Sequence, residues 1–100
     1  MLLHTVNKSP FNNSTLESCL QMSKDGSGIL FIEDGVYGAI TGSKVAAAVE
    51  AAVKSKKIYA LGPDLKARGI GDRVIDGVEV VDYAGFVDLA TEFDGIEAWL

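Results

Sequence analysis

Five short apolar segments recur along the chain, and each has the length and composition of a β-strand. Segment 29–32 is continuously apolar, which is typical of a strand buried on both faces of a parallel sheet. Segment 2–6 is rich in strand formers and ends before the turn-prone Asn7-Lys8-Ser9-Pro10, where the proline restricts Ser9 to extended conformations. The predicted strands are residues 2–6, 29–32, 57–61, 78–81 and 96–100.

Helical patterns separate these strands. Ser14-Thr15-Leu16-Glu17 has the form of a capping box, in which Ser14 accepts from the amide of Glu17, and the helix runs to about Ser23. Its inward stripe is predicted to hold Leu16, Cys19, Leu20 and Met22. The alanine-rich segment 45–53 is the strongest predicted helix. A short helix has Pro63 in its first turn and Gly69 as its C-terminal cap, and a last helix covers 83–92.

Strands and helices therefore alternate along the chain, with the turn-rich stretch 33–38 after the second strand. Short parallel strands joined by right-handed crossovers and covered by helices on both faces satisfy this order. We expect an α/β fold with three layers, α/β/α, around a mostly parallel sheet of about five strands. At 100 residues, a single domain over 1–100 is expected.

Charge and composition narrow the possible partners. Fourteen Asp and Glu stand against nine Lys and Arg, a net charge of −5, which argues against direct binding of nucleic acid. The only basic run, Lys54, Lys56 and Lys57, falls where a helix is predicted to end, and there it complements the helix dipole. Counted with glycine and without tyrosine, the apolar fraction is 56%, above the typical ~45 to 50%, so we expect contacts with other subunits.

The single cysteine and the short apolar runs favour a cytoplasmic protein. Cys19 is the only cysteine and cannot form an internal disulfide, so nothing indicates an oxidising compartment. The opening residues are too short and insufficiently basic for a signal peptide, and no apolar run reaches the ~18 residues of a membrane span.

Polar residues follow the predicted strands at the edge where parallel α/β sheets bind ligands. Glu33 and Asp34 follow the second strand, Asp64 follows the third, and Asp82 follows the fourth. Such acids can perform acid–base chemistry, but they also serve as turn residues and helix caps, which is the simpler interpretation. A small ligand-binding module that uses Asp34 and Asp64 is one alternative.

Other chemistries lack their motifs. No phosphate-binding glycine pattern follows a strand, and no Gly-x-Ser-x-Gly elbow occurs. One histidine and one cysteine fall short of a zinc site, so neither a metal nor a cofactor is expected. His4, in the first strand, is predicted to be a hydrogen-bonded structural residue. Cys19 is the one intrinsic nucleophile, and it is either a small core residue or a thiol that carries persulfide sulfur.

Several blocks together resemble one family. They are Leu3 to Phe11 (LHTVNKSPF), Glu33 to Val36 (EDGV), Tyr59 to Gly69 (YALGPDLKARG), Val81 to Leu89 (VDYAGFVDL) and Ala98 to Leu100 (AWL). Over essentially its whole length, the chain resembles the DsrH/TusB family.

The resemblance implies a small α/β subunit of a sulfur-relay complex. Such complexes are DsrEFH in sulfur oxidation and TusBCD in thiolation of the tRNA wobble uridine. It implies DsrE-like and DsrF-like partners in a heterohexamer, a dimer of heterotrimers, with a DsrC/TusE-like carrier downstream. The main persulfide cysteine is expected on the DsrE-like partner. The resemblance therefore does not decide whether this chain has enzymatic activity of its own.

The resemblance is closer to the DsrH branch, because many TusB-type members lack the cysteine of the first helix. Two further blocks support this, Asn7-Lys8-Ser9-Pro10-Phe11 and Gly62-Pro63-Asp64-Leu65. Two hypotheses follow: Cys19 is a secondary sulfur-handling thiol, which requires an accessible side chain, or the subunit is purely structural. The exposed apolar residues proposed for subunit contacts are Val36, Tyr37, Ile40, Phe93, Ile96 and Trp99.

Overall fold

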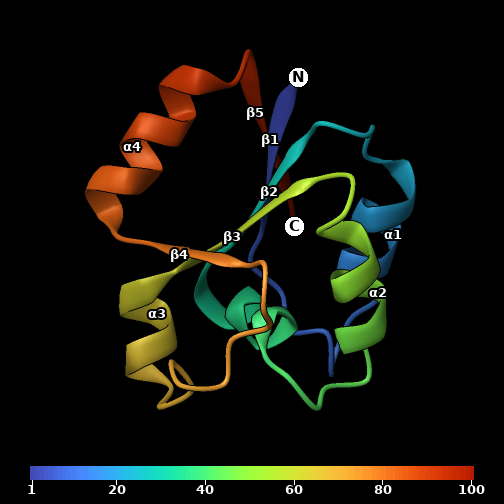
Figure 1. Ribbon diagram of the computed structural model, residues 1–100, viewed down its shortest axis with the longest axis vertical. Helices are drawn as coiled ribbons and strands as arrows, with labels where there is room; N and C mark the ends of the chain where they lie inside the picture. The colour runs from blue at the N-terminus through green and yellow to red at the C-terminus, as the bar shows by residue number, and fades with distance from the viewer.

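A five-stranded parallel sheet forms the centre of the protein in the computed structural model, which describes residues 1–100 (Figure 1). The strand order is β4-β3-β2-β1-β5, with every neighbouring pair parallel. The strands are β1 (Leu2–Val6), β2 (Gly28–Phe31), β3 (Lys57–Leu61), β4 (Glu79–Val81) and β5 (Gly95–Trp99). Both β4 and β5 are therefore edge strands.

Helices cover both faces of the sheet, as predicted. In Figure 1, α1 and α2 lie on one side of the sheet and α4 lies on the other. The helices are α1 (Thr15–Met22), α2 (Ala46–Ala52), α3 (Gly62–Ala67) and α4 (Tyr83–Glu92), with the 3-10 helix η1 (Glu33–Ala39) after β2. The three-layer α/β/α architecture expected from the alternation is confirmed.

Two apolar cores follow from the alternation of side chains along the strands. The larger core joins β1, β2 and β3 to α1, α2 and η1, and includes Val6, Phe31 and Val49. The smaller core lies under α4 and consists of Leu3, Leu30, Tyr59 and Leu89. Adjacent strand residues such as Leu30 and Phe31 thus belong to opposite cores, which explains why the central strand is uniformly apolar.

Local details differ from the sequence prediction in three places. The segment expected to be only turn-rich is the 3-10 helix η1. The Ser14 side chain makes no capping bond, and Asn13 Oδ1 accepts from the Thr15 amide at 2.7 Å. Met22 was placed on the inward stripe of α1, but its side chain is 74% exposed at the last helical position.

The structure buries some of the apolar residues proposed for subunit contacts and leaves others exposed. Val36 and Ile40 are buried in the larger core, so their expected exposure was wrong. Ile96 is 48% exposed on the edge strand β5, as expected. Trp99 is partly buried against the larger core. None of the helices is long and apolar enough to cross a membrane.

Candidate functional site

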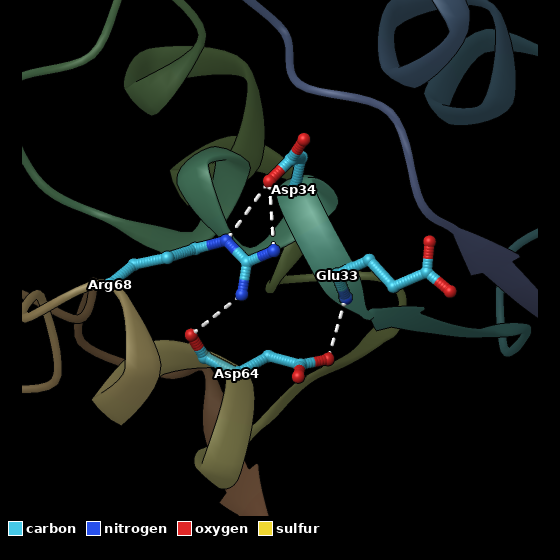
Figure 2. A network of polar contacts seen from close by, with 4 residues as sticks. All are labelled: Glu33, Asp34, Asp64 and Arg68. Carbon is cyan, nitrogen blue, oxygen red and sulfur yellow. Dashed lines mark hydrogen bonds and ion pairs between the residues drawn. The ribbon is translucent and has the colours of Figure 1, made fainter.

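The carboxyl edge of the sheet brings together polar residues that lie far apart in the sequence. Figure 2 shows Asp34 and the backbone nitrogen of Glu33, at the start of η1, facing Arg68 and Asp64. Asp64 belongs to α3, and Arg68 follows that helix. The chain runs directly from β2 toward η1 and from β3 into α3, and these two strands are neighbours. Adjacent parallel strands therefore deliver both acidic segments to one edge, where the sequence predicted a candidate site.

Arg68 connects the two segments. Its Nε and Nη2 donate to one carboxylate oxygen of Asp34, at 3.0 and 2.8 Å, and its Nη1 donates to the carbonyl of Asp64 at 3.1 Å. The Asp64 side chain in turn accepts from the backbone amide of Glu33 at 2.6 Å. The network holds η1 against α3, so Asp34 and Asp64 are engaged within the chain.

The turn that carries Glu33 is constrained by close packing. Glu33 is the only residue other than glycine with a positive φ, at 50°, a conformation that L-residues rarely adopt. Two residues later, a Cβ added at Gly35 would lie 2.0 Å from the carbonyl oxygen of Val6. Gly35 therefore lets the start of η1 press against the end of β1, and the Asp64 carboxylate stabilises the strained amide of Glu33.

A polar hollow of about 410 Å³ adjoins this network at the ends of β1 and β2. It is lined by Asn7, Lys8, Ser9, Asn12, Asn13, Glu33 and Asp34. Asn7 Oδ1 is buried and accepts no hydrogen bond from the chain. No group of three or more His, Cys, Asp or Glu side chains is arranged to hold a metal ion. The hollow is lined by polar and charged side chains only.

Asp82 has the capping role that its position predicted. Its side chain accepts from the amide of Gly85 at 2.8 Å at the start of α4. Asp34 and Asp64 differ, because their side chains bond across elements and do not cap their own helices. Sequence reasoning missed Arg68 as the link, since its partner Asp34 lies 34 positions away and no local pattern signals the pair.

Cys19 lies within the larger core, on the inward face of α1, and is 0% exposed. Burial raises the pKa of its thiol to about 12, with the negative charge of Glu97 adding to the increase and Lys56 opposing it. Sulfur handling requires an accessible thiol that can ionise, and the free chain does not provide one. The sulfur-handling role of Cys19 stays a prediction, and this burial argues against it.

His4 is the hydrogen-bonded structural residue that the sequence predicted. Its side chain is 6% exposed in β1, and its Nδ1 accepts from Nε1 of Trp99 at 3.0 Å. Glu97 Oε2 lies 3.3 Å from the same nitrogen. All three residues lie on one face of the β1–β5 pair, because His4 is registered with Glu97 and Val6 with Trp99.

Comparison with known proteins places the chain in a family. Residues 8–96 match the family model described as DsrH like protein. The chain is 36% identical to the protein TusB of Photorhabdus laumondii and 35% identical to TusB of an Enterobacter species. Each alignment covers 98% of this chain and 100% of the relative.

Two solved structures share the fold. The ychN protein of Escherichia coli matches with a TM-score of 0.84 at 18% identity, covering 97% of both chains. A protein of unknown function from Methanobacterium thermoautotrophicum matches with a TM-score of 0.74 at 19% identity, covering 97% of this chain and 96% of that one. From the family model and the full-length relatives, this chain belongs to the DsrH/TusB family.

Proposed function

We propose that this chain is a non-catalytic subunit of a cytoplasmic sulfur-relay complex of the DsrEFH type, which passes persulfide sulfur in oxidative sulfur metabolism. DsrE-like and DsrF-like chains complete the heterohexamer, and a DsrC/TusE-like carrier receives the sulfur. Family membership over residues 8–96 supports the sulfur-relay setting. The burial of Cys19, the only cysteine, supports the assignment of sulfur transfer to a partner.

Persulfide transfer requires a thiol that is both ionised and accessible. The attacking species is a thiolate, and the sulfur it receives must reach it through an open path. With a pKa of about 12, the thiol of Cys19 is ionised in roughly one molecule in 10⁵ at pH 7. No part of the side chain is exposed, so neither condition is met.

A mass measurement on the assembled complex tests the proposal. The chain is co-expressed with its DsrE-like and DsrF-like partners, treated with a persulfide donor, and each subunit is weighed intact before and after reduction by dithiothreitol. We expect a reversible gain of sulfur on the DsrE-like chain and none on Cys19. A gain that maps to Cys19 would overturn the non-catalytic assignment.

Two variants of α1 sharpen this test. Cys19→Ser removes the thiol, and Ser18→Ala alters the adjacent, half-buried position as a matched control. Both complexes are expected to assemble and to load the partner with sulfur as the wild type does. Loss of transfer in Cys19→Ser with assembly intact would instead make Cys19 a relay thiol. Failure of the wild-type chain to co-purify with these partners would remove the DsrEFH assignment itself.

A TusB-like role in thiolation of the tRNA wobble uridine is the second candidate, with the chain again purely structural. It is supported by full-length relatives named TusB at 31–36% identity. Expression of the chain in a bacterium that lacks its own TusB separates the two settings. Restored 2-thiouridine in tRNA, measured by mass spectrometry of nucleosides, favours the TusBCD role. Absence of 2-thiouridine, with the chain expressed and folded, favours DsrEFH.

A further inference from the structure

Two side chains of β5 approach the same nitrogen of His4. Trp99 Nε1 lies 3.0 Å from Nδ1 and donates a hydrogen bond to it. Glu97 Oε2 lies 3.3 Å from that nitrogen without a hydrogen bond between them. An indole N–H can only donate, and a carboxylate can only accept. Trp99 therefore needs Nδ1 without a proton, whereas Glu97 needs Nδ1 with one.

These requirements define two states of the imidazole. In the neutral ring, Nδ1 accepts from Trp99, which places the ring proton on Nε2. When the ring takes up a second proton, Nδ1 becomes a donor and Trp99 loses its acceptor. The Glu97 carboxylate is already within ion-pair distance and receives the new N–H. The structure contains the hydrogen bonding of the neutral state.

We propose that His4, Glu97 and Trp99 form a proton-sensitive switch, in which protonation of His4 exchanges the Trp99–His4 hydrogen bond for a His4–Glu97 ion pair. Histidine is the side chain whose charge ordinarily changes between about pH 5 and 8. The switch does not depend on the sulfur-relay assignment, because all three residues belong to this chain.

A route for the proton exists. His4 lines a hollow of about 340 Å³ together with Met1, Leu2, Met22, Ser23, Lys24 and Glu97. The Glu97 side chain is 55% exposed, so the carboxylate is in contact with solvent. The ring itself is almost fully buried, and an exchange of partners therefore has to occur inside the packed β1–β5 pair.

Charged groups on the neighbouring elements include Lys24, Lys56 and the amino terminus. Lys56, whose charge acts on Cys19 as that of Glu97 does, is paired with Asp25. Lys24, which follows α1, lines the same hollow, and the amino terminus is paired with Asp94 just before β5. Cys19 of α1 has its pKa raised to about 12, so it stays neutral below pH 8. The neighbour of His4 on β2 is Ile29, which carries no charge. Glu97 is the one carboxylate in contact with the ring.

The switch acts on the edge of the sheet. Trp99 is the last residue of β5, and β5 pairs only with β1 (Figure 1). Trp99 is also the residue of β5 that packs against the larger core. Loss of its hydrogen bond to His4 therefore loosens the end of the edge strand, while the Glu97–His4 ion pair holds its middle.

The test exploits the single tryptophan and single histidine of the chain. The indole N–H signal of Trp99 is followed by ¹H–¹⁵N NMR on the full-length protein between pH 5 and 8. We expect one sigmoidal change of chemical shift that follows the protonation of His4, recorded on its ring nitrogens in the same samples. An indole signal that does not change while His4 titrates would overturn the proposal.

Matched variants separate the switch from a general pH effect. His4→Asn keeps an acceptor for Trp99 but cannot titrate, so its indole signal is expected to stay constant, and a persisting transition would overturn the proposal. Glu97→Gln removes the charge that stabilises protonated His4 and is expected to move the midpoint to lower pH. Glu92→Gln, an exposed acid on α4, is the control. If His4→Asn does not fold, an unchanged midpoint in Glu97→Gln overturns the proposal.

Discussion

Arg68 donates two hydrogen bonds to a single oxygen of Asp34, although 34 positions separate the two residues in the sequence. The Arg68 side chain is 23% exposed and the Asp34 side chain 63% exposed. A pair this accessible to water is weakened by solvent screening, so most of its effect comes from fixed geometry. Its structural consequence is that η1 and α3 are held together at the carboxyl edge of the sheet.

Replacing Arg68 by alanine is expected to lower the free energy of unfolding by about 1 kcal/mol, because the exposed ion pair and the bond to the Asp64 carbonyl are lost together. Lys66→Ala, an exposed substitution on the same helix, is expected to change it by less than about 0.5 kcal/mol. Urea unfolding followed by circular dichroism provides both values. Equal effects from the two substitutions would show that the Arg68 network contributes nothing to stability.

A methyl group at position 35 is expected to be severely destabilising. In Gly35→Ala the new Cβ would lie 2.0 Å from the Val6 carbonyl oxygen, a backbone atom that cannot rotate away. We expect a loss of at least about 3 kcal/mol, well above the usual effect of one substitution. Gly71→Ala adds the same methyl where nothing lies within 4 Å, and it is expected to be nearly neutral. Comparable unfolding midpoints for the two variants would contradict the packing of η1 on β1.

Two substitutions of Asp82, the N-cap of α4, are expected to lower stability by different amounts. Asp82→Ala removes the bond to the Gly85 amide and is expected to cost about 1 kcal/mol, whereas Asp82→Asn retains an acceptor and is expected to cost less. Asp88→Asn, in the middle of the same helix and exposed, is the control. The three variants are compared by thermal unfolding. A full loss in Asp82→Asn would indicate that the charge matters more than the hydrogen bond.

The contrast between Asp82 and Asp34 shows what the sequence could predict. The cap at Asp82 depends on an amide three positions away, so the local sequence contains the whole interaction. The three central strands β1, β2 and β3 were equally predictable, because their apolar runs reflect burial between two helical layers. Asp34 has its partner on another element, and that distance is set only when β2 and β3 pair in register.

Competition between neighbouring residues accounts for the remaining errors in the local prediction. Asn13 and Ser14 both carry side-chain oxygens at the start of α1. Asn13 Oδ1 accepts from the Thr15 amide, whereas the side chain of the N-cap residue Ser14 makes no capping bond. Met22 has the spacing of the inward stripe but lies in the last turn, where the helix leaves the core. The burial of Cys19 beside Leu16 was available from the spacing, whereas the magnitude of its pKa increase required the packed structure.

The buried thiol makes stability depend on alkaline pH. In the unfolded chain Cys19 ionises near its ordinary pKa, and in the folded protein only near 12, so between these values the unfolded state releases a proton that the folded state retains. Stability from this group is complete below the unfolded pKa of about 9 and is lost as pH rises toward 12. The expected slope is about −1.4 kcal/mol per pH unit over that interval.

Comparison with Cys19→Ala isolates this contribution from the titration of lysine and tyrosine. The substitution creates a small cavity, so the variant is less stable at pH 8, but its free energy of unfolding should lack the thiol-dependent slope. Between pH 8 and 10 the difference between wild type and variant is expected to shrink by about 1 kcal/mol, measured by urea unfolding under a reducing agent. A constant difference would mean that Cys19 ionises equally in both states. The thiol would then be open to solvent, and Cys19 would meet the structural requirement for carrying persulfide sulfur.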